Sequence, residues 1–530
     1  MLKIRISNTD TAIWCDEGAN LLHVLLKEGI FVDSPCGGKG TCGKCKVRIV
    51  SGNGTALSHG EKKFLTEEER QKGIRLSCFV EVKEDMEVAL LKQEKEGKVM
   101  TEGYLPEFER EYKEGYGIAV DIGTTTVVME LVDLSTGKIF QHASRINGQK
   151  QYGLDVLTRI SYEYEHPETG AEELQKAIVD CLNEMLEEVY KKAEIAPEDV
   201  KEIDVAANCT MLHMLLGADA RPIGRSPYQP EFTNSKTLLA SDIGLNTGKK
   251  TVLYCLPSVS AFIGADIVAG AYVCGLQKEK KNVLFIDIGT NGEIVLAAKG
   301  RLFSCSCAAG PALEGMNISC GMRAAEGAIE EVEMTPQGVK LTVIGGKEPE
   351  GFCGSGILAA VRELLKIGVI KKTGVFVKKE SLEESDYRFS FIRLNGTKRE
   401  AVFSEKPELF LTQGDIRQVQ LAKGAVLSGF KALLKQAEVK MEDLDQVLIA
   451  GQFGAYLPAC SLTGVGILPD EVKERISYVG NTSKTGAYMA LMSENAKKEM
   501  EELAEKIEYM ELAETEGYER IFTESMIFPN

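Results

Sequence analysis

The pattern of apolar and polar positions differs between the two ends of the chain. Before residue 93 it predicts short alternating strands, at 2–6 and 46–50, separated by turns. After residue 116, apolar strands alternate with amphipathic helices, such as the surface helix expected at 170–195. We therefore expect an α/β multidomain protein with a small first domain.

A charged segment marks the expected domain boundary. Residues 93–116 carry eleven charged side chains in twenty-four positions, without a sustained apolar period, which suits an exposed linker. The prediction is a first domain at 1–92, this linker, and a second domain at 117–530. The full length of 530 residues is enough for two or three hydrophobic cores.

Composition narrows the class of protein. The formal net charge of −17 repels phosphate backbones and anionic lipids, so neither nucleic acid nor a membrane is an expected partner. There is no apolar stretch of membrane-spanning length and no apolar signal segment at the N-terminus, so we expect a cytoplasmic protein. In that compartment a cluster of cysteines indicates metal ligation before disulfides.

Four cysteines form the strongest chemical signal. Cys36, Cys42 and Cys45 lie in one glycine-rich loop, residues 34–45 (SPCGGKGTCGKC), and Cys78 follows 33 positions later. The glycines let the backbone curl around a cluster and direct N–H groups at its sulfurs, so the set predicts a 2Fe-2S cluster. A structural zinc site is the alternative, but zinc loops rarely combine this glycine density with one distant cysteine.

The first domain resembles a ferredoxin of the β-grasp fold over residues 1–92. None of the other ten cysteines has Cys-x2-Cys spacing, and only Cys305 and Cys307 are close together in sequence. Most of these cysteines are expected to be buried small side chains. A second metal or redox role for Cys305 and Cys307 is the alternative.

Two strand–turn–strand segments carry the same motif. Residues 121–124 and 287–290 both read Asp-Ile-Gly-Thr after an apolar strand. The glycine permits backbone amides to approach phosphate, threonine hydroxyls add donors, and the aspartate can hold hydrated magnesium. One copy could equally be an ordinary hairpin, but two copies suggest related lobes that clamp phosphates between them. The expected phosphate-side residues are Gly123, Thr124, Thr125, Thr126, Gly289, Thr290, Asn291, Gly292 and Glu293.

The order of these motifs resembles the superfamily of actin, Hsp70, sugar kinases and acetate kinase (ASKHA). Residues 258–270 look like its first connecting helix, residues 447–454 like its adenosine motif, and residues 481–487 like its second connecting helix. Taken singly, each could be an ordinary packing helix or strand-to-helix turn. The resemblance implies a two-lobed ATPase, with lobe I at 117–278 and 484–530 and lobe II at 279–483. It implies catalytic roles for Asp121, Asp266 and Asp287, and adenosine contacts from Gly451, Gln452, Phe453 and Gly454.

Together, the two domains resemble the reductive activators of corrinoid proteins. Segments 147–159, 208–213, 308–315 and 353–356 also fit that family. Some members have an extra middle domain, whereas only the short charged segment precedes the first phosphate hairpin here, which does not favour dimerisation through such a domain.

The resemblance implies ATP-dependent transfer of an electron from the 2Fe-2S cluster to cob(II)alamin. The product, cob(I)alamin, would serve a methyltransferase system of anaerobic metabolism. The implied cofactors are the 2Fe-2S cluster, ATP and Mg2+. The implied partners are a corrinoid protein and a low-potential electron donor, and a homodimer is compatible with the resemblance.

Three other functions fit parts of the sequence. An ATP-driven activator of a radical dehydratase or reductase also joins this ATPase fold to iron-sulfur chemistry, but through a cluster shared between subunits. A small-molecule kinase could use the cluster as a redox sensor. A passive ferredoxin carrier would leave the large second domain without a role.

Overall fold

The computed structural model describes residues 1–7, 11–28, 30, 32, 34, 38, 40, 43–52, 55–91, 104–396, 398–451 and 457–529. The chain divides into two compact units, each described separately below. One unit comprises Met1–Lys95, Ile146–Cys181 and Met214–Ser226, and the other comprises Glu96–Arg145, Leu182–His213 and Pro227–Asn530. Among the described residues, no helix has both the length and the apolar character needed to cross a bilayer.

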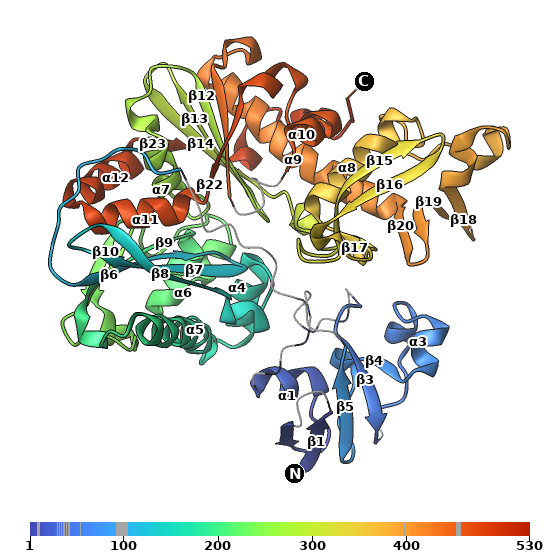
Figure 1. Ribbon diagram of the computed structural model, residues 1–530, viewed down its shortest axis with the longest axis horizontal. Coiled ribbons are helices and arrows are strands. Elements are labelled where there is room, and N and C mark those ends of the chain that lie inside the picture. Colours follow the sequence, from blue (N-terminus) through green and yellow to red (C-terminus); the bar gives the residue numbers. More distant parts are fainter. Residues whose placement is uncertain are drawn as a thin grey trace. The chain divides into compact units, whose positions relative to one another are not determined.

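The N-terminal residues form a five-stranded sheet in the order β2-β1-β5-β3-β4, drawn in blue in Figure 1. Strands β1 and β5 are parallel and pair Ile4 with Met86, while the β1–β2 and β3–β5 pairs are antiparallel. Helix α1 begins at Asn20, whose side chain accepts the backbone N–H of His23. The strands are β1 (Leu2–Ile6), β2 (Thr11–Cys15), β3 (Lys46–Ser51), β4 (Ile74–Leu76) and β5 (Met86–Leu90), and the helices are α1 (Leu21–Lys27), α2 (His59–Lys62) and α3 (Glu67–Gln71).

Two six-stranded sheets form the larger part of the chain, in the orders β10-β11-β9-β6-β7-β8 and β22-β21-β12-β13-β14-β23. In the first, β6 pairs with β7 antiparallel and with β9 parallel. In the second, β12 pairs with β13 antiparallel and with β21 parallel. The repeated order confirms the prediction of two related lobes. The first sheet consists of β6 (Tyr116–Ile122), β7 (Thr126–Asp133), β8 (Lys138–Ile146), β9 (Val200–Ala207), β10 (Lys236–Leu239) and β11 (Val252–Cys255). The second consists of β12 (Val283–Ile288), β13 (Gly292–Ala298), β14 (Arg301–Cys307), β21 (Gln446–Ala450), β22 (Ile476–Gly480) and β23 (Ile507–Tyr509).

The helices of these lobes bring distant parts of the sequence together. Helix α11 packs against α7 as well as against β6 and β9, and Figure 1 shows α11 in red beside the yellow-green α7. Gly486 of α11 makes this contact close, because a Cβ at that position would lie 2.4 Å from the Cβ of Ala269. The helices are α4 (Val156–Glu165), α5 (Gly170–Ala193), α6 (Cys209–Leu216), α7 (Ala265–Val273), α8 (Gly354–Lys366), α9 (Gln413–Ala437), α10 (Ala459–Val465), α11 (Thr482–Met492), α12 (Glu494–Lys506) and α13 (Tyr518–Ser525).

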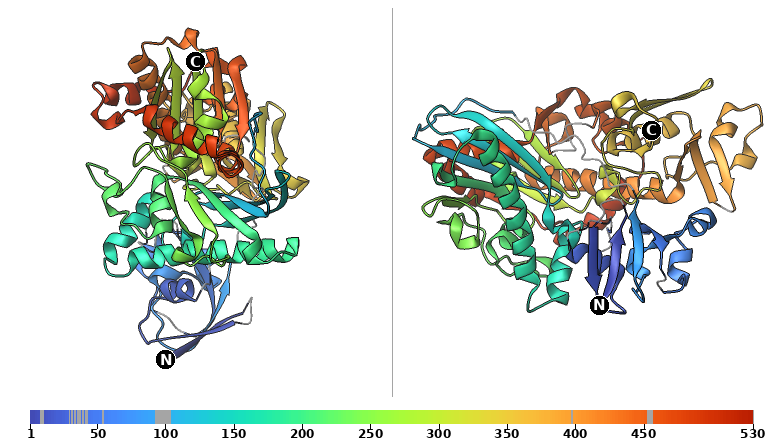
Figure 2. Two further views of the ribbon diagram at one scale, coloured as in Figure 1. Left: turned by 90° about the vertical axis from the view of Figure 1, so that its left-hand side faces the viewer. Right: turned by 60° about the horizontal axis from the view of Figure 1, so that its bottom comes forward.

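Two three-stranded sheets belong to lobe II. They have the orders β16-β15-β17 and β18-β19-β20 and are drawn in yellow and orange, next to each other, in Figures 1 and 2. Helix α8 packs on β15, and α9 packs on β14 and β20. The strands are β15 (Ala328–Thr335), β16 (Gly338–Val343), β17 (Gly351–Phe352), β18 (Ile392–Asn395), β19 (Lys398–Glu405) and β20 (Glu408–Thr412).

The structure corrects the expected position of the C-terminus. Residues 484–530 were all expected in lobe I, and α11 and α12 do pack on α7. However, β23 extends the second sheet by pairing with β14, and α13 packs on α9. Buried Phe528 belongs to the core of lobe II, so the chain crosses to lobe II after α12.

The structure also corrects part of the expected linker. Residues 93–103 lie outside the described residues, but residues 104–115 lie along both lobes, against β22 of the second sheet and against α11. The backbone N–H of Tyr104 donates to Val479 O at 2.9 Å, and that of Glu111 donates to Met492 O at 2.8 Å. The ring of Phe108 packs edge-on against Tyr488. Two of these contacts are made by backbone groups, which leave no apolar pattern in the sequence.

Candidate functional site

Two of the four predicted cluster ligands converge in the ferredoxin-like sheet. The sulfur atoms of Cys45 and Cys78 are 3.2 Å apart, although the residues are 33 positions apart in sequence. The Asn20 side chain donates to Cys78 O at 2.9 Å, and Ser77 N–H donates to Cys45 O at 2.8 Å. These bonds fix the backbone of both cysteines. Cys36 and Cys42 lie outside the described residues, so their positions remain predictions.

The surroundings of these thiols fit a cluster-binding loop. Gly43 has φ +68°, and a Cβ there would lie 2.7 Å from the Phe64 ring. Gly40 has φ +71° and would similarly meet the ring of Phe79 at 2.5 Å. Only glycine fits both the backbone angle and the space. The converging thiols, which are soft ligands when ionised, and this glycine-rich loop therefore suit a 2Fe-2S cluster.

Asp121, at the end of β6, is held by two side chains from the start of α11. Asn481 Nδ2 donates to Asp121 Oδ2 at 2.8 Å, and Ser483 Oγ donates to Asp121 Oδ1 at 2.8 Å. All three side chains are buried. Burial raises the pKa of Asp121, while these hydrogen bonds and the nearby Lys484 oppose the increase. Asp121 is therefore fixed in orientation by residues 360 positions away.

The two predicted phosphate hairpins both close through the N–H of their glycine, but the first turn is one residue longer than the second. Gly123 N–H donates to Thr126 O at 3.0 Å in the first, and Gly289 N–H donates to Asn291 O at 2.9 Å in the second. A Cβ on Gly123 would lie 2.7 Å from Thr126 O, so this turn requires glycine. The predicted turn residues 123–126 and 289–291, together with Glu293, retain partial solvent exposure, whereas Gly292 is buried.

Further polar side chains hold the threonines of these turns. Asn208 Nδ2 donates to Thr124 Oγ1 at 3.1 Å, and its Oδ1 accepts the N–H of Met211 at the start of α6. In the second hairpin, Thr290 Oγ1 donates to the Glu314 carboxylate. Each turn is thus hydrogen-bonded to a neighbouring segment of its own lobe.

Three further carboxyl groups of this site, those of Asp266, Asp287 and Glu293, have pKa values well above the ordinary range. Burial, followed by the charges of Asp287 and Asp121, raises the pKa of Asp266 to about 8. Burial and the charge of Asp121 raise the pKa of Asp287 to about 7. Desolvation of its carboxyl group, followed by the charges of Asp266 and Asp287, also raises the pKa of Glu293, although the residue keeps part of its surface exposed. Because like charges repel, an ionised carboxylate in this group raises the pKa of its neighbours. A bound cation would favour their ionised forms. Within the described ranges, no three His, Cys, Asp or Glu side chains converge on one metal-binding point.

The end of β21 lies against this acidic group. Gly451 has φ +91°, and a Cβ there would lie 2.4 Å from Asp287 Oδ1. Gly451 therefore brings the predicted adenosine segment close to the second phosphate hairpin. Gln452, Phe453 and Gly454 lie outside the described residues.

The structure brings together the three predicted catalytic aspartates and both hairpins. Four further residues, Asn208, Glu314, Asn481 and Ser483, support these groups although the sequence predicted no role for them. Asn481 and Asn208 carry a local signal, since each begins a helix directly after a strand. Ser483 and Glu314 carry none, because their partners are set by packing between distant segments.

The raised pKa values predict a pH-dependent response to nucleotide. Asp266 and Asp287 have ordinary carboxyl pKa values of 3.8 when unfolded and about 8 and about 7 when folded. The folded protein therefore binds these protons more tightly, and the associated stability is lost as pH rises from about 4 through 8. We expect the melting temperature of the nucleotide-free protein to fall between about pH 6 and pH 8.5. The increase on adding MgATP should grow over the same interval, because cation binding needs the ionised carboxylates.

Differential scanning fluorimetry across this pH range measures both effects. Asp266→Asn removes the carboxyl group with the higher pKa of the two and should flatten the pH dependence. An unchanged pH profile in this variant would contradict the assignment.

The fold and the two sites define an iron-sulfur protein that carries an ASKHA domain. Family models agree over most of the chain: "2Fe-2S iron-sulfur cluster binding domain" matches residues 4–83, "RACo middle region" matches 116–279, and "C-terminal domain of RACo the ASKHA domain" matches 281–530. A solved structure described as "Reductive activator for corrinoid,iron-sulfur protein" covers 100% of this chain and 99% of its own, with 30% identity and a TM-score of 0.69. The chain belongs to the family of reductive activators of corrinoid proteins.

Curated relatives carry related descriptions. The "Corrinoid activation enzyme RamQ" of Eubacterium limosum is 36% identical over 396 residues, 74% of this chain and 66% of its own length. The "[Co(II) methylated amine-specific corrinoid protein] reductase" of Methanosarcina barkeri is 24% identical over 443 residues, 77% of this chain and 76% of its own. The match of residues 116–279 to the middle region corrects the expectation that this chain lacks such a part, because 117–278 was expected to belong to lobe I of the ATPase.

Proposed function

We propose that this protein uses ATP to drive one-electron reduction of a corrinoid protein from cob(II)alamin to cob(I)alamin. The proposal is carried by the combination, in one chain, of a converging thiol pair, Cys45 and Cys78, with duplicated hairpins whose aspartates lie close enough for the charge of Asp121 to raise the pKa of Asp287. The names of the similar proteins supply the substrate class.

The electron path begins at the four cysteines. Cys36, Cys42, Cys45 and Cys78 would hold the 2Fe-2S cluster, and the bound cluster supplies one electron per turnover. A low-potential donor would restore that electron. In each transfer, one electron leaves the cluster and converts cob(II) to cob(I) on the partner.

The need for ATP follows from the energetics of this transfer. Every 59 mV by which the donor potential is too high lowers a one-electron equilibrium about tenfold. Closure of the lobes on ATP would stabilise a complex in which the corrinoid accepts the electron more readily, and hydrolysis would release it. Reduction can thus be coupled to nucleotide binding without a phosphorylated product.

Three sets of residues would form the nucleotide site, one each for Mg2+, phosphate and adenosine. Asp121, Asp266 and Asp287 would hold Mg2+ through its water ligands, since this ion usually keeps several waters, and orient the attacking water. Backbone amides and hydroxyls of 123–126 and 289–292 would bind phosphate, with Glu293 beside them. Residues 451–454 would seat adenosine, with glycines allowing the nucleoside to lie against the backbone.

The decisive measurement follows cob(II) loss and cob(I) appearance by absorbance. The anaerobic full-length protein is mixed with a low-potential reductant and a panel of corrinoid methyltransferase subunits, with and without MgATP. Cob(I) formation that requires both ATP and the protein is expected for at least one subunit. ATP hydrolysis and cluster cycling without any cob(I) would contradict the proposal and favour an activator of a radical dehydratase. A phosphorylated metabolite would instead identify a kinase.

The electron donor and the oligomeric state can each be tested separately. The same assay run with different low-potential proteins in place of the chemical reductant would identify a competent electron donor. Sedimentation at several protein concentrations tests whether the chain forms a homodimer, which would sediment as a single species of twice the chain mass.

A further inference from the structure

A buried ion pair joins the start of α11 to the sheet of lobe I. Lys484 Nζ, in the first turn of α11, lies 2.5 Å from Glu130 Oε1 on β7, and each side chain is 5% exposed. Glu130 is directly opposite Ala119 of β6, so it lies on the same face of the sheet as Asp121, two residues further along β6. The pair therefore joins α11 to the sheet face that carries Asp121.

The same turn of α11 holds the carboxylate of Asp121. Asn481 and Ser483 donate to its two oxygens, each at 2.8 Å. The backbone N–H of Lys484 donates to Asn481 Oδ1 at 3.0 Å. A shift or rotation of this turn would move both donors relative to Asp121. Lys484 opposes such a movement, because its ammonium group is bonded to β7, the strand next to β6.

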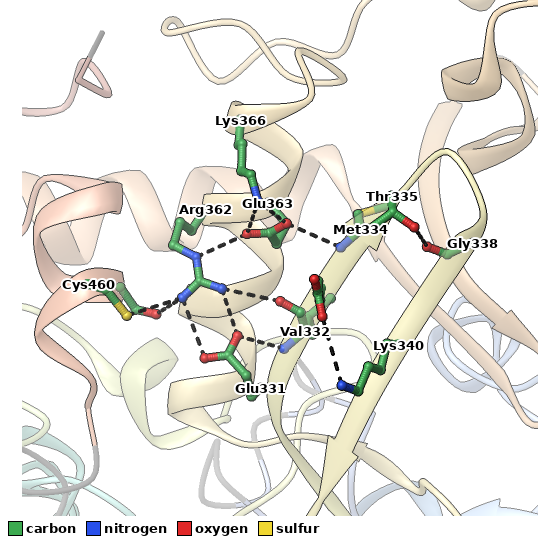
Figure 3. Close-up of polar contacts among 12 residues, drawn as sticks. Glu331, Val332, Met334, Thr335, Gly338, Lys340, Arg362, Glu363, Lys366 and Cys460 are labelled. Carbon is green, nitrogen blue, oxygen red and sulfur yellow. Dashed lines mark hydrogen bonds and ion pairs between the residues drawn. The ribbon is translucent and has the colours of Figure 1, made fainter.

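This pair is more deeply buried than a comparable helix–strand pair in lobe II. There, Arg362 of α8 binds Glu331 of β15 at 2.7 Å, as Figure 3 shows, but their side chains are 19% and 36% exposed. Removing two charged groups from water costs free energy that their attraction only partly returns, so a buried pair adds little net stability. Its geometric effect is larger, because a charge-assisted hydrogen bond is strong only over a narrow range of distance and angle. The buried pair thus favours one position of α11 on β7.

We infer that Lys484 and Glu130 form a positioning pair that holds Asp121 in the orientation needed for nucleotide-bound magnesium. This rests on the proposed role of Asp121. The pair acts through Asn481 and Ser483, because it fixes the first turn of α11 and this turn fixes the carboxylate. The phosphate turn at 123–126 belongs to the same β6–β7 hairpin, so the pair also keeps α11 in a fixed relation to that turn.

Lys484→Met is expected to weaken metal binding and to slow hydrolysis. It leaves Glu130 buried without its charged partner, so the start of α11 should move on β7. With ADP at saturation, the apparent dissociation constant of Mn2+, used as the probe in place of Mg2+, should rise about tenfold. The kcat for ATP hydrolysis should fall about 30-fold, since a misplacement of about 1 Å can cost about 100-fold. Glu130→Gln keeps an acceptor for Lys484 without its charge and should change each value about threefold.

The double variant Lys484→Met/Glu130→Leu separates positioning from stability. Two apolar side chains of similar size fill the same space without an unpaired charge, so the melting temperature should return to within about 3 °C of the wild-type value. An apolar contact is non-directional, so the Mn2+ constant and kcat should stay close to those of Lys484→Met. A pair that only stabilised the fold would instead recover all three values.

Lys497→Met provides a matched control. Lys497 of α12 lies 2.5 Å from Glu202 of β9, and their side chains are 8% and 15% exposed. This pair also joins a helix to the sheet of lobe I, but its partners Glu202, Asp204 and Glu494 lie outside the candidate site. The control should lose stability, as Lys484→Met does, while its Mn2+ constant and kcat stay within about twofold of wild type.

The measurements use full-length, cluster-loaded protein without a corrinoid protein. Electron paramagnetic resonance of free Mn2+ gives the metal constant, steady-state ATP hydrolysis gives kcat, and differential scanning fluorimetry gives the melting temperature. Wild-type Mn2+ constants in both Lys484→Met and Glu130→Gln would overturn the inference, as would full recovery in the double variant or an equal loss in Lys497→Met. Should Lys484→Met fail to fold, Glu130→Gln and the double variant decide.

Failure of the inference can be told apart from failure of the proposed function. A wild-type protein that binds Mn2+ with ADP but forms no cob(I) would contradict the proposed function and leave the comparison of variants intact. A wild-type protein that binds no Mn2+ with ADP would contradict the proposed nucleotide site itself, and with it the role of the pair.

Discussion

Replacing Asp121 with asparagine is expected to lower ATP-dependent cob(I) formation by about 100-fold or more, because it removes a charge that orients the cation and the attacking water. The fold should tolerate this change. The asparagine oxygen can accept from Asn481 Nδ2, and its amide can donate to the hydroxyl of Ser483, so both existing bonds can be replaced. A neutral amide also costs less to bury than a carboxylate.

The rate is measured with the absorbance assay at saturating MgATP, together with the melting temperature and the cluster spectrum. Asp204→Asn is the matched control, since Asp204 is another buried aspartate in the same sheet, on β9, but pairs with Lys497 instead of the candidate site. Control activity within about threefold of wild type is expected. Full activity in Asp121→Asn would show that the nucleotide site is wrongly assigned.

Replacing Cys78 with alanine is expected to abolish cluster assembly and, with it, all detectable cob(I) formation. A 2Fe-2S cluster needs four ligands, and Cys78 is the one delivered from a separate segment, next to Cys45. ATP binding should persist within about twofold, because the nucleotide site lies in the other compact unit. The variant thus tests electron transfer from the cluster separately from ATP binding.

Iron content, the visible spectrum of the cluster and calorimetric ATP binding measure these effects. Cys15→Ala is the matched control, because Cys15 is a buried core residue of the same domain and is not a predicted ligand. The control should retain the cluster. A cluster that persists unchanged in Cys78→Ala would rule out the proposed ligand set.

The sequence alone determined the class of this protein. Cysteine spacing and glycine density are local properties, so residues 34–45 and Cys78 were sufficient to predict an iron-sulfur domain. The duplicated Asp-Ile-Gly-Thr turns were likewise visible, because a strand, a tight turn and a second strand leave a continuous pattern. Their repetition predicted the two related lobes that the matching sheet orders confirm.

The tertiary structure decided which residues support that chemistry. Asn481 meets Asp121 across 360 positions, and Lys484 meets Glu130 across 354, so no local period could reveal these pairs. It also placed β23 and α13 in lobe II, where β14 and α9 offer a free sheet edge and an apolar face. Periodicity records which face of an element is apolar. Which other element covers that face depends on the packing of the whole chain.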